Sequence, residues 1–234
     1  MCFSAGASFG ASAVLSIIGA AAIIKARSVP QALFAAIPMI FSIQQLSEGM
    51  LWLSLKDPQP ASWQPFVTYT FLVFALVIWP VWIPFTIRRL EKDAKRKKIL
   101  NLLLLTGIVV SAGTAWALLF YPVKVTPADH HLHYDLCIPA GTENLIKVFT
   151  LLYFATTIIT TFVSSVKRMK WLGIVFLLSY MFTVIFYSGS IVSVWCYFAA
   201  LLSIVVFWIV LDLQEPIGTP DQGKMKPVKA TSFQ

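Results

Sequence analysis

The stretch RRLEKDAKRKKILNLLLLTGIVVSAGTAWALLF, residues 88–120, is the most informative part of the sequence about the fold. It begins with seven Lys and Arg residues between positions 88 and 98 and continues with 22 residues that carry no charge. A helix of about 20 apolar residues crosses the hydrocarbon core of a bilayer, and Lys and Arg accumulate in loops on the cytoplasmic side. The stretch therefore predicts a cytoplasmic loop followed by a transmembrane helix.

The composition of the whole chain agrees with a membrane protein. Of the 234 residues, 58% are hydrophobic and 12% are charged, and the mean hydropathy is +0.79, whereas soluble domains carry about 25% charged residues. The net charge of +8 invites a nucleic-acid partner, but the basic residues lie at predicted helix ends and in short loops. That placement predicts a lipid bilayer with its headgroups as the partner, and no nucleic acid.

Seven apolar segments predict an all-α fold, a polytopic seven-helix transmembrane bundle. The sixth and seventh segments form one continuous apolar run, in which Ser188-Gly189-Ser190 is the plausible turn. After the last segment, residues 214–234 are rich in Pro, Gly and Lys and predict a disordered tail. The predicted spans are about 5–24, 31–54, 65–87, 99–120, 145–166, 171–187 and 191–211.

The distribution of Lys and Arg predicts the orientation. Fifteen of the 18 basic residues fall in the connections at 25–30, 88–98 and 167–170 and in the tail after 211. Because cytoplasmic loops are the basic ones, these segments are assigned to the cytoplasm. The N-terminus is then outside and the C-terminus cytoplasmic, in a multi-pass protein of a bacterial inner, or plasma, membrane.

One acidic residue, Glu48, lies inside a predicted span, about 9 Å below its outer edge at 1.5 Å per residue. An ionised acid near the bilayer centre costs about 2.5–3.5 kcal/mol, so Glu48 needs a partner, water or a proton. Gln44 lies one turn earlier and Gln45 and Ser47 are adjacent. We interpret this stretch as a polar pocket in the outer leaflet; alternatively, a protonated Glu48 joins helices through hydrogen bonds.

The outer connection at 121–144 holds all three histidines of the chain, His130, His131 and His133. Imidazoles beside carboxylates and a thiol suit Zn or Cu, although the spacing matches no known ligand pattern. A pH-sensitive loop and an ordinary polar loop are the alternatives. Cys2 and Cys137 both fall on the outer side, where an oxidising compartment would allow a disulfide between them.

Four short motifs resemble an uncharacterised family of bacterial integral membrane proteins whose members begin Met-Cys-Phe-Ser-Ala. The motifs are Met1-Cys2-Phe3-Ser4-Ala5, Gln44 to Gly49, His131 to Tyr134, and Ser193 to Ala200 with Trp195-Cys196. The resemblance implies no activity, because the family has none assigned. All four motifs map to the outer half of the predicted bundle, so we hypothesise one ligand site. Its residues are Cys2, Ser4, Gln44, Gln45, Glu48, His131 and Cys196, with Trp195 beside them.

Three classes of function fit these features. The first is a membrane protein that binds or moves a small ligand or ion at the pocket around Glu48. The second is a membrane-embedded enzyme, with or without a metal, for which Ser4, Glu48, the histidines and Cys196 offer nucleophile, base and ligand groups. The third is a structural or assembly partner without ligand chemistry. The absence of His and Asp inside the predicted helices makes the enzyme the weaker alternative to ligand binding.

Overall fold

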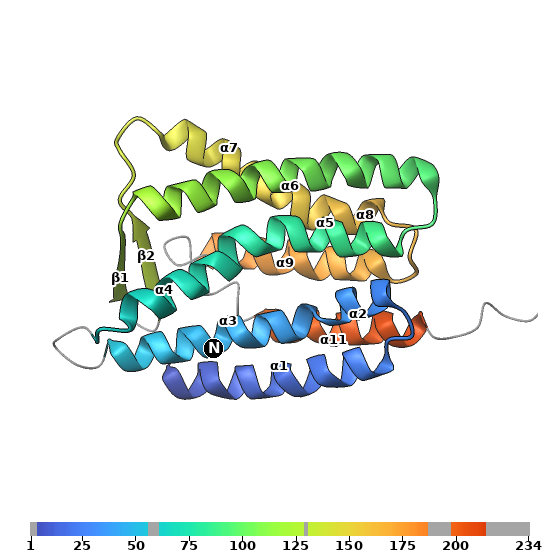
Figure 1. The fold of residues 1–234 in the computed structure, drawn as a ribbon, viewed down its shortest axis with the longest axis horizontal. Helices are drawn as coiled ribbons and strands as arrows, with labels where there is room; N and C mark the ends of the chain where they lie inside the picture. The colour runs from blue at the N-terminus through green and yellow to red at the C-terminus, as the bar shows by residue number, and fades with distance from the viewer. Residues whose placement is uncertain (1–3, 56–60, 129–130, 187–197, 214–234) are drawn as a thin grey trace, which may run out of the picture.

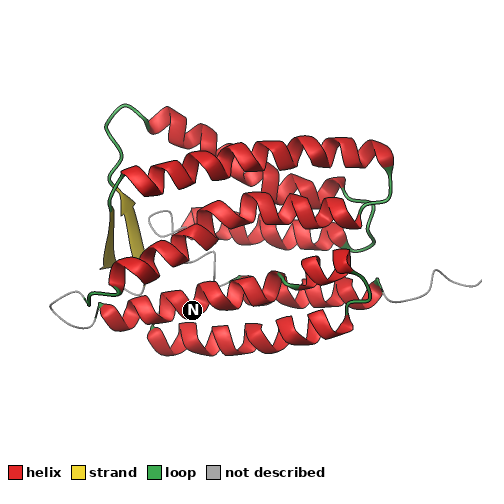
Figure 2. Ribbon diagram, in the orientation of Figure 1, coloured by secondary structure: helices red, strands yellow, loops and turns green. Residues whose placement is uncertain are grey.

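The computed structural model describes residues 4–55, 61–128, 131–186 and 198–213, and these are mostly helical. The helices run along the long axis of the molecule, and one small β-hairpin lies across one end (Figures 1 and 2). We call this end the hairpin end. The opposite end, where α1, α5, α8 and α11 end and α6 and α9 begin, is the basic end, because it carries most of the Lys and Arg of the described residues.

Within the described residues, six helical segments are long and apolar enough to cross a membrane. Three of them are composite, since a turn or a π-helical segment, labelled η, interrupts them. The six are α1 (Ala5–Lys25); α2 (Val29–Ala35) with α3 (Ile37–Ser54); α4 (Gln64–Leu72) with η1 (Val73–Ile78) and α5 (Trp79–Leu90); α6 (Ala94–Phe120); α7 (Glu143–Phe154) with η2 (Ala155–Ile159) and α8 (Thr160–Val163); and α9 (Met169–Phe186).

The last described helix, α11 (Ala199–Asp212), is apolar but shorter, with 14 residues. It packs against α1, α2, α3 and α9 (Figure 1). The predicted seventh span, 191–211, starts among residues 187–197, which lie outside the described part of the chain. The multi-pass membrane fold is therefore confirmed through six helices, and the seventh crossing stays a prediction.

Side-chain caps fix where several helices begin. The backbone N–H of Ala7 donates to Ser4 Oγ at 3.2 Å, and that of Arg96 donates to Asp93 Oδ1 at 2.9 Å. Each cap satisfies one of the four N–H groups that the first turn of a helix leaves unpaired. The Asp93 cap starts α6 at Ala94, so this helix continues for one turn beyond its apolar span, into the basic segment.

Serines join α1 to α3 inside the apolar bundle. Ser12 Oγ donates to the carbonyl of Ser42, and Ser42 Oγ donates to the carbonyl of Ser12, both at 2.9 Å. At Gly19 an added Cβ would lie 2.8 Å from the backbone nitrogen of Met39. Small residues therefore bring the two backbones close together, as is common where membrane helices pack.

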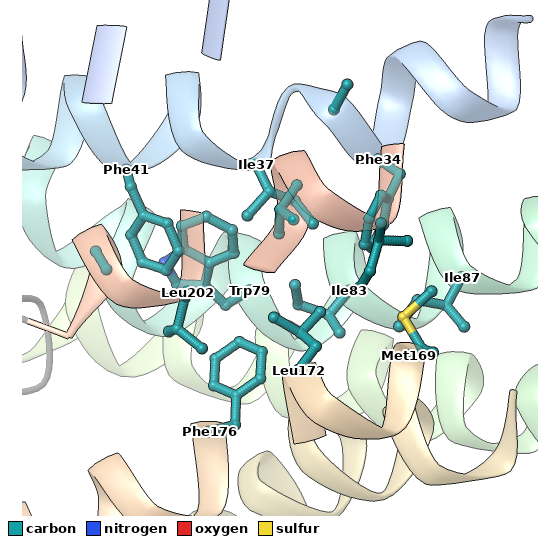
Figure 3. Close-up of a cluster of buried hydrophobic side chains, with 14 of the residues drawn as sticks. Phe34, Ile37, Phe41, Trp79, Ile83, Ile87, Met169, Leu172, Phe176 and Leu202 are labelled. Carbon is teal, nitrogen blue, oxygen red and sulfur yellow. The ribbon is translucent and has the colours of Figure 1, made fainter. Parts of the chain in front are cut away.

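The main hydrophobic core lies where α2, α3, α5, α9 and α11 meet (Figure 3). The rings of Phe41 and Trp79 stack at its centre, with centroids 4.1 Å apart. Met169 and Ile87 continue the core toward the basic end. The labelled members of the cluster are Phe34, Ile37, Phe41, Trp79, Ile83, Ile87, Met169, Leu172, Phe176 and Leu202.

The connection between α6 and α7 contains a β-hairpin, which corrects the expectation of helices alone. β1 (Val123–Ala128) pairs antiparallel with β2 (His131–Leu136), so that Val125 lies opposite Tyr134. Leu132 is fully buried, and the Tyr134 ring stacks on Phe71 of α4 at 5.0 Å. Alternate residues of β2 thus pack on the helices, the period of two that a half-buried strand requires.

A buried carboxylate, Glu91, connects two turns at the basic end through hydrogen bonds. Its Oε1 accepts the backbone N–H groups of Lys92 at 2.9 Å and Asp93 at 3.0 Å, and its Oε2 accepts the N–H of Ser165 at 2.6 Å. Burial alone would raise the pKa of this carboxyl, but the hydrogen bonds from the Ser165 side chain and from these N–H groups lower it to about 2. The carboxylate thereby joins the α5–α6 turn to the α8–α9 turn.

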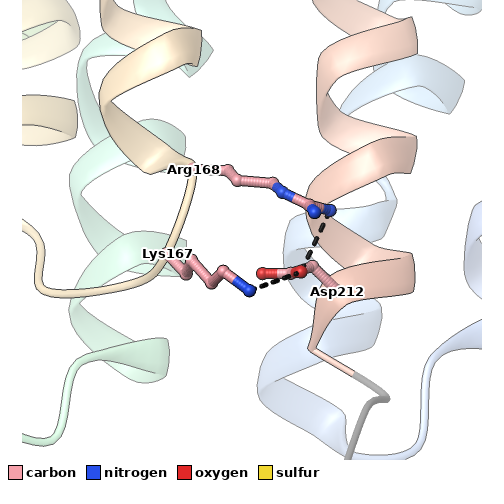
Figure 4. Close-up of polar contacts among 3 residues, drawn as sticks. All are labelled: Lys167, Arg168 and Asp212. Atoms are coloured by element: carbon pink, nitrogen blue, oxygen red, sulfur yellow. Dashed lines mark ion pairs between the residues drawn. The ribbon is translucent and has the colours of Figure 1, made fainter.

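A second acid, Asp212, ties α11 to the α8–α9 turn (Figure 4). Its Oδ1 forms ion pairs with Arg168 at 3.0 Å and Lys167 at 3.5 Å. The Arg168 guanidinium also lies 4.1 Å from the centroid of the Trp208 ring. Arg168 has a φ of +67°, a left-handed conformation that costs about 1 kcal/mol or more in a residue with a Cβ. The contacts of its side chain offset that cost.

Candidate functional site

The polar stretch of α3 predicted around Glu48 is turned into the protein. Gln44, Gln45 and Glu48 are 1%, 2% and 0% exposed. Gln45 Nε2 donates to Glu48 Oε2 at 3.3 Å, and Trp79 Nε1 donates to Gln44 Oε1 at 3.0 Å. Buried polar groups are stable only when they are hydrogen-bonded. These two hydrogen bonds satisfy part of the hydrogen-bonding capacity of the three side chains.

Beside this stretch is a cavity of about 470 Å³. It lies between α3, α5, α6 and α7, with the connection at 136–142 over it. Gln44 and Trp79 close its inner end, where Phe176 and Leu202 also line it. Gln45 and Glu48 are not among the described residues on its walls, so the space runs past the polar stretch and touches it at Gln44.

The cavity walls are almost entirely apolar and uncharged. None of the described lining residues is Asp, Glu, His, Cys, Lys or Arg. The polar side chains on the walls, besides Gln44, are hydroxyls such as those of Thr114 and Tyr153. An apolar space of this size accommodates a small apolar molecule better than an ion, because an unpaired charge inside it would lose its hydration.

Two π-helical segments flank the cavity, and Pro80 explains one of them. Proline has no N–H, so residue 80 can donate neither to Leu76, as in an α-helix, nor to Ala75, as in a π-helix. Another helix supplies one donor, since Tyr153 Oη donates to the Ala75 carbonyl at 2.7 Å. The Thr114 hydroxyl lies 3.2 Å from the Leu76 carbonyl, but it shares its one proton with the Val110 carbonyl of its own helix at 2.9 Å. Single π-helical turns are frequent at functional sites.

Two glycines of α6 set how closely its neighbours approach. A Cβ added at Gly107 would lie 1.9 Å from the carbonyl oxygen of Pro80, whose α-helical donor is missing because residue 84 is also a proline. A Cβ added at Gly113 would lie 2.3 Å from the ring of Phe149 on α7. The first contact is with backbone and the second with a side chain that lines the cavity.

The structure places the other predicted ligand-binding residues only in part. Ser4 is exposed and caps α1. Cys2, Trp195 and Cys196 lie outside the described residues. Gln44, Gln45 and Glu48 are therefore the members of the predicted site that the structure brings together.

The predicted metal site and disulfide rest largely on undescribed positions. His130 lies outside the described residues, and only the backbone of His131 is described, within β2. His133 and Cys137 are half-buried, and the Cys137 thiol is free. The described residues contain no group of three or more His, Cys, Asp or Glu that could hold a metal. Zn or Cu binding and the Cys2–Cys137 disulfide thus stay predictions.

No pattern in the sequence marks the cavity itself. Its outer walls come from α6 and α7, through Gly113, Ala117, Ile146 and Phe149. These residues have no chemistry that distinguishes them from other lipid-facing positions. One signal was present, since Pro80 and Pro84 in a predicted span indicate unpaired carbonyls and therefore local irregularity.

Six apolar helices and a partly enclosed apolar cavity define the class of this protein, a polytopic α-helical membrane protein. The chain belongs to a family of unknown function, DUF6629, whose match covers residues 1–218. This match confirms the predicted membership of an uncharacterised family and includes every described helix. No curated protein and no solved structure matches the chain.

Proposed function

We propose that this membrane protein binds a small, predominantly apolar ligand in the cavity between α3, α5, α6 and α7. The observation that supports the proposal is an apolar space of about 470 Å³ with one buried amide, Gln44, at its inner end. Ligand pockets commonly measure about 300–1,000 Å³ and combine apolar walls with a few placed polar groups. Gln44 is the polar group at that inner end, where its amide oxygen accepts a hydrogen bond from Trp79 Nε1.

Glu48 positions α3 rather than contacting the ligand. It is fully buried and accepts a hydrogen bond from Gln45, on the stretch of helix that presents Gln44 to the cavity. A buried polar network that is satisfied holds its members in one arrangement. The pocket expected around Glu48 thus becomes an apolar pocket whose polar end is supported by Glu48.

The charges support an orientation with the hairpin end outside. All but two of the described Lys and Arg residues lie at the basic end, and the exceptions are Lys124 and Lys147. By the positive-inside rule, the basic end is cytoplasmic, the N-terminus is outside and the C-terminus is inside. This requires a seventh crossing at 191–211 and puts the cavity in the outer leaflet of a plasma membrane.

Ligand binding is favoured over the enzyme alternative by the chemistry of the walls. General acid–base or metal-assisted catalysis needs a His, carboxylate or similar group within reach of the reacting atoms. The described cavity walls offer amide, indole and hydroxyl groups instead. Such groups recognise and orient a bound molecule.

Photolabelling with azidoanthracene, a neutral apolar probe, tests this proposal. The full chain is reconstituted in nanodiscs, and labelled peptides are identified by mass spectrometry. We expect saturable labelling of Trp79 and Tyr153, which are 5% and 9% exposed. Ala117→Phe, on the cavity wall, should reduce that labelling by about tenfold, because the new ring removes burial of the probe's apolar surface equivalent to about two methylene groups.

The matched control is Ala112→Phe, an exposed position on the same helix, which should leave labelling unchanged. Equal labelling of Trp79 and Tyr153 in both variants, or none in the wild type, would contradict ligand binding in this cavity.

A further inference from the structure

The first turns of α7 stand apart from the rest of the bundle (Figure 1). Tyr153 is the buried residue of this helix, whereas Leu145, Val148 and Leu151 are 58%, 51% and 70% exposed. Phe149 is the point where α7 packs over Gly113 of α6. Between the hairpin end and Phe149, the two helices are therefore separated by side chains that line the cavity.

The cavity is open at this separation. Three of its lining residues there are large and partly accessible: Trp116 on α6 is 54% exposed, and Leu145 and Ile146 on α7 are 58% and 44% exposed. Leu119 and Phe120, just beyond Trp116 on α6, are 81% and 66% exposed. Large apolar side chains with this exposure are stable when they face lipid, so the opening leads sideways into the bilayer.

The end of the cavity toward the water is covered. Leu136, Ile138 and Thr142, from the connection between β2 and α7, line it there. β2 is held in place because Leu132 is fully buried and Tyr134 stacks on Phe71. A ligand from the aqueous side would have to displace this anchored segment, whereas one from the bilayer meets an apolar path from Trp116 and Ile146 to Phe41 at the inner end.

We propose that the ligand is an acyl chain of a bilayer phospholipid, which enters the cavity sideways between α6 and α7. This inference rests on the proposed function. An acyl chain carries no charge and forms no hydrogen bonds, which matches cavity walls without charged side chains. The headgroup stays at the hairpin end, at the level of the exposed Lys147 at the start of α7, whose long stem allows its amine to reach the interface.

The test is photolabelling in nanodiscs that contain a phosphatidylglycerol with a diazirine near the end of one acyl chain. Bulk lipid labels lipid-facing residues such as Ile17, which is 70% exposed. A chain inside the cavity also labels Phe41 and Tyr153, which are 7% and 9% exposed. Ala117→Phe should reduce the labelling of Phe41 and Tyr153 by about tenfold, by the same loss of buried methylenes, and leave Ile17 unchanged.

Ala112→Phe is the matched control and should behave as the wild type. If Ala117→Phe does not fold, Ala117→Leu replaces it, with a smaller expected reduction. Labelling confined to Ile17 and other exposed positions overturns the proposal, and so does labelling of Tyr153 that Ala117→Phe leaves unchanged. If azidoanthracene labels Tyr153 and the phospholipid does not, the acyl-chain proposal fails and ligand binding stands; if neither labels it, both fail.

Discussion

The two ends of the bundle use their polar groups in opposite ways. At the basic end, Glu91 accepts hydrogen bonds from backbone N–H groups and joins the α5–α6 turn to the α8–α9 turn. Asp212 pairs with cationic side chains and joins α11 to the α8–α9 turn. At the hairpin end, the amides of Gln44 and Gln45 face inward, next to an apolar cavity under a long connection. Buried acids therefore hold this fold together at the basic end, and an apolar space remains at the hairpin end.

The largest effect is expected at the middle of α6, where Gly107 packs against the backbone of α5. In Gly107→Ala the new Cβ would meet the Pro80 carbonyl at 1.9 Å, and backbone cannot move aside as a side chain can. We expect a loss of at least about 3 kcal/mol of stability, at the upper end of overpacking effects. Thermal unfolding in detergent measures it.

Gly113→Ala is the control for that change, since its Cβ would meet the Phe149 ring beside open space. It should cost much less, because the ring can shift into the cavity. An equal loss from both substitutions would contradict the idea that space is available at the hairpin end only.

A smaller effect is expected from Glu91→Gln at the basic end. The pKa of Glu91 falls from 4.5 to about 2, a difference that corresponds to about 3 kcal/mol of stabilisation of the ionised form. Because Gln keeps one acceptor oxygen, we expect to lose most but not all of this. The midpoint of thermal unfolding at pH 7 is the measurement.

Glu143→Gln, an exposed glutamate at the start of α7, is the matched control at the hairpin end and should leave the midpoint unchanged. A similar drop of the unfolding midpoint in both variants would contradict the proposed difference between the basic end and the hairpin end.

Acid should loosen the basic end through the same carboxyl. Since the folded pKa of Glu91 lies below its ordinary value, its contribution is complete above pH 4.5 and is lost as the pH falls toward 2. Hydrogen exchange followed between pH 6 and pH 3 should show rising exchange at Asp93 and Ser165 after correction for the intrinsic rate. In Glu91→Gln that pH-dependent rise should be absent; its persistence would assign the acid sensitivity to other groups.

The smallest effect is expected from Asp212→Asn, which removes the ion pairs with Arg168 and Lys167. Asp212 is nearly buried, but the Lys167 side chain is 72% exposed, so solvent screens part of the attraction. We expect a loss of about 1 kcal/mol, the upper range for pairs near a surface. Chemical denaturation at low and high salt checks it, and the loss should shrink with salt. Asp135→Asn, on the exposed face of the hairpin, is the control.

The sequence predicted the helices well because lipid imposes a simple length rule. The span expected at 99–120 is the apolar part of α6, and the span at 31–54 corresponds to α2 and α3. The inward orientation of Gln44 and Glu48 followed from the cost of polar groups in lipid. These inferences need only the order of residues along one helix.

The cavity and the hairpin could not be predicted in the same way. The cavity is lined from two helices, by Ala117 of α6 and Ile146 of α7 among others, and no single helix carries the information that a space lies between them. The alternation of Leu132 and Tyr134 in β2 was visible in the sequence, but it covers six residues in a connection that was read as polar because of its histidines. In the sequence, Glu91 is one loop acid among several, since its donors at Ser164 and Ser165 are more than 70 positions away.

The bond between Tyr153 and Ala75 restricts the width of whatever occupies the cavity. The Tyr153 hydroxyl satisfies a carbonyl that Pro80 leaves without a helical donor. A bulky guest that pushed the phenol aside would strand that carbonyl in an apolar wall, at a cost of about 1–3 kcal/mol. Flat or slender molecules can pass the ring without disturbing it, so the passage favours thin shapes over thick ones.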